Sequence, residues 1–332
     1  MSNWPSRKNF WENKRVLLTG GAGFLGSQVV KKLQDLNPAD IVVPRSAEYD
    51  LRCPNVVRDL LAEVKPHIVL HLAARVGGIA ANKAAPANLF YDNLMLGVPL
   101  LHESWEAGVE KFVGVGSVCS YPDECPLPFS EENLWNGYPE ETNAPYGLAK
   151  RMLIAGAKAY RSQYGFNAIT VMPVNMYGPG DHIDLATSHV LPALTRKCLE
   201  ARRRNDEQVV VWGTGIATRE FLYVEDAAEA ILLAAERYNS SEPVNLGSGR
   251  EVSIRELIEK LVELTHFQGK IVWDDSKPDG QLRRCLDTSR AFEAFGFKAQ
   301  TSFEEGLART VEWMDSEGGL DPVLEQHVQQ SD

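Results

Sequence analysis

The chain of 332 residues is 44% hydrophobic and 24% charged, an ordinary composition for a globular protein with a large core. Its formal net charge of -11 argues against general binding to nucleic acid or to an anionic membrane. Its five scattered cysteines include no Cys-x-x-Cys pair, and no apolar run is long enough to span a bilayer. We therefore expect a cytoplasmic protein without a disulfide framework or a zinc knuckle.

The first predicted strand covers residues 15–19, after a polar stretch over residues 1–14 that we expect to pack on the surface. Its short apolar run is typical of a buried parallel strand. Glycines follow at once in a Gly-x-Gly-x-x-Gly spacing, ahead of a helix predicted over residues 27–36. Small residues between a strand and a helix let the backbone and the helix N-terminus approach a pyrophosphate. We expect a dinucleotide to bind at Gly20, Gly23, Phe24, Leu25 and Gly26.

The second predicted strand covers residues 40–43, and its end indicates which dinucleotide binds. An NAD site usually has an acidic residue there for the ribose 2′-hydroxyl. This chain has Arg45, which suits a 2′-phosphate and favours NADP(H). Asp50 and Leu51 are placed to reach the adenine, although Asp50 can equally cap the next helix.

Three more strands are predicted over residues 67–74, 111–116 and 169–173, with a helix over residues 93–105 between the first two. The alternation of strands and helices predicts a doubly wound parallel sheet, which binds ligands at the carboxyl ends of its strands. Several residues lie at or just after those ends. They are Ala73, Ala74, Ser117, Pro173, Asn175 and Met176.

The pattern becomes irregular after residue 173, which predicts a second, smaller mixed α/β domain that binds substrate. We expect an α/β protein with a Rossmann-like dinucleotide-binding domain over residues 14–173 and 221–247. The substrate domain then takes residues 174–220 and 248–316. Residues 1–13 and 317–332 are expected to be terminal extensions, the second of them loose.

A further helix is predicted from Pro145, and it carries Tyr146 and Lys150 four residues apart on one face. A nearby ammonium favours the phenolate, so Lys150 should lower the pKa of Tyr146 and make it a better acid and base. The spacing alone is common by chance, and an ordinary surface helix is the alternative.

Taken together, the glycine loop, Ser117, Tyr146 and Lys150 resemble the extended short-chain dehydrogenase/reductase family. The resemblance implies that Ser117, Tyr146 and Lys150 form a catalytic triad with NADP(H) beside the tyrosine. It adds Tyr146, Lys150 and His189 to the cofactor-binding residues. It also implies a homodimer formed by the helices after Asn93 and around Tyr146.

Seven segments are similar to a narrower group in that family, which acts on a GDP-sugar. They cover residues 74–79, 117–122, 175–179, 188–194, 211–213, 219–221 and 276–280. That group converts GDP-4-dehydro-6-deoxy-D-mannose to GDP-L-fucose by epimerising C3 and C5 and then reducing C4 with NADPH. Inverting an acidic carbon needs a base on one face and an acid on the other. The resemblance assigns these roles to Cys119 and His189.

The same resemblance implies the substrate contacts. Ser117 would hydrogen-bond to the C4 oxygen, which Tyr146 would protonate. Asn175 would orient the sugar, and Trp212 would pack on the guanine or sugar. Lys197, Arg219 and Lys277 would neutralise the diphosphate.

Other interpretations stay open. Cys119 can be a small hydrophobe and His189 a structural histidine. Asp181, His182, Asp184 and His189 form no tight ligand spacing, so no metal is expected. Some relatives have a cation where this loop has Ala22, which leaves the 2′-phosphate to Arg45. Another nucleotide-sugar epimerase, a 4-ketoreductase or an NADP-binding regulator without turnover remains an alternative.

Overall fold

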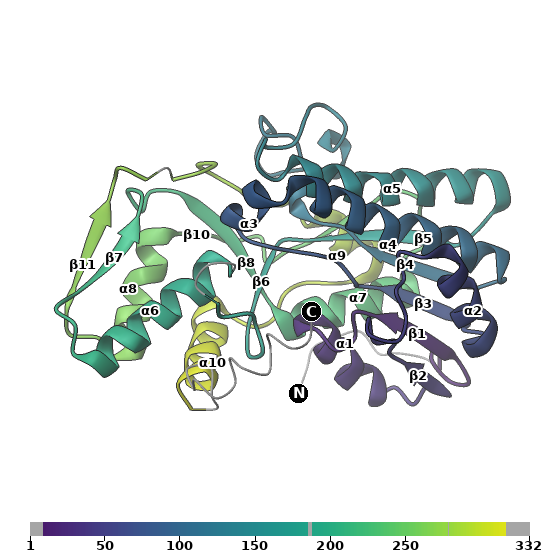
Figure 1. Cartoon of the computed structure of the whole chain (residues 1–332), viewed down its shortest axis with the longest axis horizontal. Coiled ribbons are helices and arrows are strands. Elements are labelled where there is room, and N and C mark those ends of the chain that lie inside the picture. The colour runs from purple at the N-terminus through teal and green to yellow at the C-terminus, as the bar shows by residue number, and fades with distance from the viewer. Residues whose placement is uncertain (1–8, 185–187, 278, 317–332) are drawn as a thin grey trace.

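The larger part of the molecule is built on one six-stranded sheet, seen in a computed structural model that describes residues 9–184, 188–277 and 279–316 (Figure 1). All its neighbouring strands are parallel, in the order β2-β1-β3-β4-β5-β9. The chain leaves β1 toward β2 on one side and returns to β3 on the other. This reversal opens a crevice at the carboxyl ends of the strands. The strands are β1 Arg15–Thr19, β2 Asp40–Val42, β3 Ile68–His71, β4 Lys111–Val115, β5 Ala168–Pro173 and β9 Val244–Leu246.

Helices cover both faces of this sheet, which confirms the predicted doubly wound architecture (Figure 1). Successive strand residues point to opposite faces. Val16 and Leu18 therefore lie in a core with the helices of one face, while Leu17 lies in a second core with those of the other. The first face carries α1 Phe24–Gln34, α7 Val224–Arg237 and α9 Ser289–Phe295. The second carries α2 Pro54–Val64, α4 Pro86–Glu106 and α5 Ala144–Tyr164.

The smaller part has its own hydrophobic core and a mixed α/β composition, as predicted. Its boundaries remain a prediction, and the strand near residue 221 pairs in the smaller sheet while α7, directly after it, packs on α1. The three-stranded sheet contains β6 Asn175–Tyr177, β8 Thr218–Tyr223 and β10 Glu251–Ser253. A second pair contains β7 Gln208–Trp212 and β11 Lys270–Asp274. The helices are α6 Val190–Arg204, α8 Ile254–Thr265 and α10 Phe303–Ser316, and a short α3 Ile79–Ala84 precedes α4.

We expect residues 1–14 to pack on the surface, but in the part that the structure describes, residues 9–14, one side chain enters the core. Trp11 is only 2% exposed and belongs to the core between the sheet and α1. Its indole N–H donates to Glu236 of α7 at 2.6 Å, which satisfies the one polar atom of a buried ring. The predicted loose tail after Ser316 lies outside the described residues. No helix among the described residues is long and apolar enough to cross a membrane.

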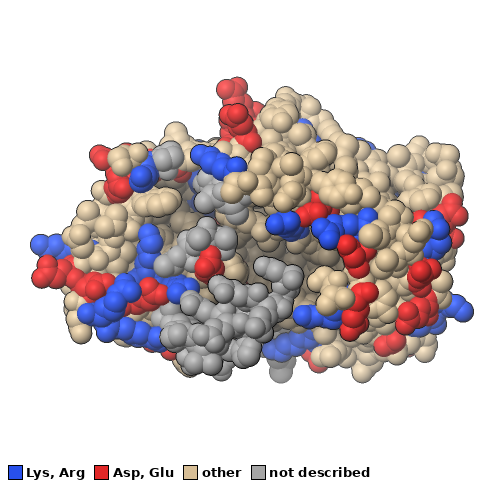
Figure 2. All heavy atoms as spheres, viewed as in Figure 1, with Lys and Arg blue, Asp and Glu red and all other residues tan. Residues whose placement is uncertain are grey.

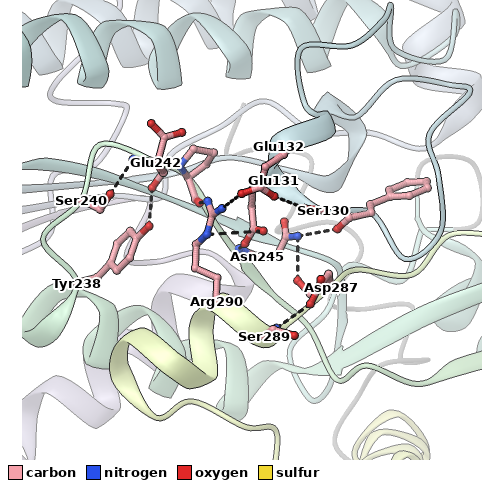
Figure 3. A network of polar contacts seen from close by, with 12 residues as sticks. Ser130, Glu131, Glu132, Tyr238, Ser240, Glu242, Asn245, Asp287, Ser289 and Arg290 are labelled. Atoms are coloured by element: carbon pink, nitrogen blue, oxygen red, sulfur yellow. Dashed lines mark hydrogen bonds and ion pairs between the residues drawn. The ribbon is translucent and has the colours of Figure 1, made fainter.

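A polar network around buried Asn245 fixes two connecting segments to the middle of β9 (Figure 3). The Asn245 backbone N–H donates to Glu131 at 2.8 Å, and its side-chain amide donates to the carbonyls of Phe129 and Asp287 at 2.9 and 3.0 Å. Arg290 forms an ion pair with Glu132. Since Asn245 is fully buried, each of these bonds counts for more than a surface bond. The network therefore holds residues 129–132 and 287–290 in fixed positions.

Candidate active site

The glycine loop leaves no room for side chains between β1 and α1. A Cβ on Gly20, which has a φ of +74°, would lie 2.7 Å from the Ala73 nitrogen. A Cβ on Gly26 would lie 2.0 Å from the Gly20 oxygen. Helix α1 begins at Phe24, three residues before the predicted start, and its N-cap Gly23 has no side-chain cap. This bare helix N-terminus at the sheet edge fits a pyrophosphate.

The loop after β2 carries the residues expected to recognise the adenosine end. Arg45 is exposed, and no ion pair to a described carboxylate is seen for it. Asp50 instead accepts a hydrogen bond from Arg52 at 2.9 Å, which lowers the pKa of Asp50. The suggestion that Asp50 caps the next helix was wrong, because Cys53 is the N-cap of α2. Leu51 is buried in the core beneath α2.

Ser117, Tyr146 and Lys150 meet at the carboxyl end of β4. Ser117 caps a short 3-10 helix, η1 Val118–Ser120, and accepts a hydrogen bond from the Cys119 N–H at 3.2 Å. The Lys150 ammonium lies 5.8 Å from the centre of the Tyr146 ring and donates to the Val115 carbonyl at 2.9 Å. The Ser117 side chain lies near enough to Tyr146 to act on the pKa of its hydroxyl. The structure thus brings Ser117, at the end of a strand, together with the two residues that the sequence placed on one helix.

The ionisation of this group differs from what we had expected. Burial raises the pKa of Tyr146, the nearby Cys119 raises it further, and the Ser117 side chain only partly offsets this. The predicted lowering of the Tyr146 pKa by Lys150 was therefore wrong for this structure, because burial dominates. Burial also lowers the pKa of Lys150 to about 8.

Cys119 and His189 approach from different elements. Cys119 is half-buried on η1, against which α5 packs so closely that a Cβ on Gly147 would lie 2.3 Å from the Cys119 oxygen. His189 is the N-cap of α6 and reaches solvent, yet protein surrounds it closely enough for burial to lower its pKa. The charges of His182 and Arg284 lower the His189 pKa further. Arg284 also contacts Cys119, so it links the surroundings of the two candidate acid–base residues.

The candidate substrate residues divide into two groups. Trp212 is 65% exposed, and the ammonium groups of Lys197 and Lys277 lie 5.8 and 5.9 Å from its ring centre. Arg219 is not part of this group. Its guanidinium donates to the Gln281 carbonyl at 2.6 Å, and burial lowers its pKa to about 10. Asn175 opens β6, two residues beyond Pro173, and is half-buried like Met176.

Figure 2 shows that this face of the molecule is hollowed between the larger and the smaller part, with Lys and Arg side chains around the hollow. Such a cleft between two parts of a fold is a common place for a small-molecule site. Within the described residues, no group of three or more His, Cys, Asp or Glu side chains could hold a metal ion.

Sequence reasoning missed two features of this site. Arg284 was not singled out, although it follows closely after the segment 276–280 whose similarity was noted. Asp181 was considered only as a metal ligand. Burial raises its pKa to about 7, and its Oδ2 atom is buried without a hydrogen-bond partner among the described residues. Neither environment is visible without tertiary contacts.

Comparisons with known proteins agree with this geometry. The model of the NAD dependent epimerase/dehydratase family matches residues 16–247. GDP-L-fucose synthase 1 of Arabidopsis thaliana is 41% identical over 302 residues, which cover 91% of this chain and 93% of the relative. A GDP-L-fucose synthetase of Naegleria fowleri bound to NADP superposes with a TM-score of 0.83 at 30% identity, covering 94% of this chain and 97% of that one. A GDP-mannoheptose C4 reductase of Campylobacter jejuni with NADP bound gives a TM-score of 0.83 at 28% identity, covering 92% and 99%.

Proposed function

The chain belongs to the NAD dependent epimerase/dehydratase family, and we propose that it converts GDP-4-dehydro-6-deoxy-D-mannose to GDP-L-fucose. The reaction combines epimerisation at C3 and C5 with NADPH-dependent reduction at C4. One observation carries the proposal beyond reduction. Cys119 lies two residues after Ser117 on η1, and Arg284 links its surroundings to those of His189. A simple ketoreductase needs the Ser, Tyr and Lys but has no use for an acid–base pair beside them.

NADP(H) fits the site as the cofactor. The side-chain-free loop at Gly20 and Gly26 and the uncapped start of α1 suit its pyrophosphate. Arg45 has no carboxylate partner among the described residues, stands where an NAD site has a carboxylate, and suits the 2′-phosphate. When bound, NADPH supplies the hydride for C4.

In the epimerisation, Ser117 donates a hydrogen bond to the C4 oxygen of the sugar. Cys119 as a thiolate removes the proton at C3, and the electrons of that C–H bond move toward the C4 oxygen to give an enolate. Protonated His189 returns a proton to the opposite face of the carbon, and the ketone reforms with inverted configuration. Proton exchange with water resets Cys119 and His189, and the same steps then invert C5.

In the reduction, Tyr146 donates its phenolic proton to the C4 oxygen as that oxygen gains charge. Lys150 lies beside the ring and keeps a positive charge near the developing phenolate. The raised pKa of Tyr146 suits this role. Tyr146 must carry its proton before the step, because that proton becomes part of the new C4 hydroxyl. Ser117 holds the same oxygen throughout both halves of the reaction.

The GDP part of the substrate suits the group formed by Trp212, Lys197 and Lys277. The exposed indole offers a flat apolar surface for guanine, and two ammonium groups near it can neutralise a diphosphate. Arg219 contributes by fixing the segment 279–281 rather than by joining this group.

A homodimer through α4 and α5 is part of the proposal. These two helices pack side by side, and each turns an apolar stripe to solvent. Helical neighbours lie three and four residues apart, so each stripe forms one continuous face. An apolar face on a two-helix layer is what a symmetric four-helix interface needs. The stripes contain Tyr91, Leu94, Met95 and Val98 on α4 and Leu148, Met152, Ala155 and Ala159 on α5.

The activity is tested with GDP-4-dehydro-6-deoxy-D-mannose and NADPH, following the nicotinamide absorbance and identifying the product by NMR. In deuterated water without NADPH, the enzyme should incorporate deuterium at C3 and C5. Cys119→Ala should abolish this incorporation, whereas Cys125→Ala should not, because burial raises the pKa of Cys125 to about 11 and keeps it protonated. NADPH oxidation with C3 and C5 unchanged would make the chain a C4 reductase instead.

A further inference from the structure

Arg284 reaches the candidate base from a segment far away in the sequence. Its Nη1 atom lies 3.8 Å from the Cys119 sulfur and donates a hydrogen bond to it. A guanidinium remains charged at every pH at which the protein is folded. A permanent positive charge in contact with a thiol favours the thiolate.

The guanidinium is held in this orientation by Gln281. The Gln281 side-chain oxygen accepts hydrogen bonds from Arg284 Nε at 3.1 Å and Nη2 at 2.9 Å. The amide nitrogen of Gln281 donates to the Asp123 carbonyl at 2.8 Å, four residues beyond Cys119. Gln281 therefore fixes the Nε–Nη2 edge of the guanidinium, so that Nη1 is directed at the Cys119 sulfur.

The backbone around Arg284 is equally fixed. Buried Glu220 accepts a hydrogen bond from the Leu286 N–H at 2.7 Å, and the Cys285 carbonyl accepts one from the Phe129 N–H at 2.8 Å. The network at Asn245 holds the following residue, Asp287 (Figure 3). Arg284 is thus a built part of the site and not a surface side chain that happens to lie near a cysteine.

We propose that Arg284 is a positioning residue that holds the Cys119 sulfur as a thiolate, ready to accept the proton of the substrate carbon. The proton-transfer role rests on the proposed epimerisation, whereas the effect on the sulfur does not. Arg284 itself exchanges no proton. It acts only through the charge on Cys119.

The other charged groups around η1 are engaged elsewhere. From α5, Lys150 donates to the Val115 carbonyl and Arg151 to the Ser120 carbonyl at 2.9 and 2.6 Å. Tyr146 offers only a neutral hydroxyl, because burial raises its pKa. From β8, Arg219 donates to backbone carbonyls, and in the loop after η1, Asp123 offers its carbonyl to Gln281. Of the described cations, Arg284 is the one that hydrogen-bonds to the sulfur.

The same charge has a useful effect on the second residue of the pair. His189 feels the positive charge of Arg284, which contributes to lowering the His189 pKa. A protonated imidazole with a lower pKa gives up its proton more readily, so it is a stronger acid. One fixed cation therefore makes Cys119 available as a base and strengthens His189 as an acid.

The test measures the pH dependence of Cys119 alkylation by iodoacetamide, quantified on the Cys119 peptide by mass spectrometry. Exposed Cys53 on the same chain serves as internal reference. Arg284→Gln should move the alkylation midpoint up by about one pH unit or more, the usual effect of removing an opposite charge at this distance. Arg284→Lys keeps the charge and should shift it less. Arg283→Gln is the matched control, because Arg283 is exposed and pairs with Glu251 instead.

An unchanged midpoint in folded Arg284→Gln would overturn the proposal. If that variant does not fold, Gln281→Glu carries the test, because a carboxylate on the guanidinium competes with the thiolate and should raise the midpoint. An unchanged midpoint there is equally decisive against Arg284. The assay needs no substrate, so its result is independent of whether the wild type forms GDP-L-fucose. Where that activity is present, deuterium incorporation at C3 should fall in Arg284→Gln while NADPH binding persists.

Discussion

Tyr146 and Cys119 both lie beside Ser117, the residue proposed to bind the C4 oxygen, but they serve different halves of the proposed reaction. Single substitutions should therefore separate epimerisation from reduction. Tyr146→Phe removes the acid that protonates the C4 oxygen. We expect reduction to fall by about a hundredfold or more, the usual contribution of a general acid, while NADPH still binds. Incorporation of deuterium at C3 should fall less, because Ser117 still holds the oxygen.

Stopped-flow absorbance gives the reduction rate, and fluorescence titration gives NADPH affinity. Tyr138→Phe is a suitable control, because that ring is 63% exposed on the loop before α5. Near-normal reduction by Tyr146→Phe would remove Tyr146 from the mechanism.

We expect Arg45 to decide which cofactor the proposed site prefers. Arg45→Ala removes one charge-assisted bond to the 2′-phosphate, which typically contributes about 1.5–3 kcal/mol. The preference for NADPH over NADH, measured as the ratio of kcat/KM values, should fall roughly tenfold or more. Lys31→Ala, an exposed cation on α1, should leave the ratio unchanged. An unchanged preference for NADPH over NADH in Arg45→Ala would show that another group recognises the 2′-phosphate.

Helix α5 has to touch η1 for the site to form, and this depends on one glycine. A Cβ on Gly147 would lie 2.3 Å from the Cys119 backbone oxygen, which cannot move without shifting η1. Gly147→Ala should therefore destabilise the protein by about 1–3 kcal/mol and impair both half-reactions. On the same helix, a Cβ on Gly156 would meet only the end of the Leu101 side chain, at 2.9 Å.

Gly156→Ala is thus the matched control, since the gain in helix propensity of about 1 kcal/mol offsets a small adjustment of Leu101. Urea unfolding of both variants, with rates measured in parallel, makes the comparison. Equal stability of the two would mean that the contact between α5 and η1 is looser than the structure indicates.

Strands β1 and β3 are joined by a buried histidine that makes stability depend on pH. His71 is 1% exposed, contacts Thr19 Oγ1 at 2.8 Å, and has its pKa lowered to about 3 by burial and by the charge of Lys150. The unfolded chain protonates this residue below about pH 6.5, whereas the folded chain does not. Stability should therefore fall as the pH drops from about 6.5 toward 3.

This group alone contributes a slope of up to about 1.4 kcal/mol per pH unit. His71→Asn keeps a hydrogen-bonding side chain and should lower the slope of unfolding free energy against pH by up to one proton. Urea titrations between about pH 6.5 and 4.5 measure it. Parallel slopes for the two proteins would contradict the assignment of a neutral buried His71.

The strands and helices were predictable wherever local sequence decides them. The run at residues 15–19 forms β1 as expected, and the segment from Pro145 forms a helix with Tyr146 and Lys150 on it. The start of α1 was placed three residues too late, because Gly23 serves as a cap without a side-chain signal. Boundaries set by backbone geometry alone leave little trace in composition.

The parts of the site that depend on long-range contacts were not predictable. Arg284 contacts Cys119 although it follows Cys119 by more than 160 residues in the sequence. This contact depends on Gln281 and Glu220, which hold the segment of Arg284 in place. The pKa of Tyr146 was expected to fall because only its neighbour Lys150 is visible in the sequence, whereas burial decides the direction. Trp11 was misjudged for the same reason, since its pocket is formed by distant α7.

At the scale of the whole molecule, the described residues leave an apolar surface uncovered on the outer side of α4 and α5, and its role can be tested by introducing a charge. Met152 is 39% exposed in the middle of the α5 stripe, next to the stripe that α4 presents. In a symmetric interface the same residue of both chains lies in the contact. Met152→Glu would therefore place two carboxylates in an apolar environment. We expect the wild type to sediment at twice the mass of one chain and Met152→Glu to sediment as a monomer. Val210→Glu introduces the same charge at a similarly exposed position, 40%, on β7 of the smaller part, and should leave the dimer intact.

The candidate active site lies at the start of α5. A dissociated but folded Met152→Glu should keep its reduction activity if the interface only stabilises the helix, and lose it if the interface also sets the position of Tyr146. A monomeric wild type would refute the interface, and the apolar stripes would then need another partner.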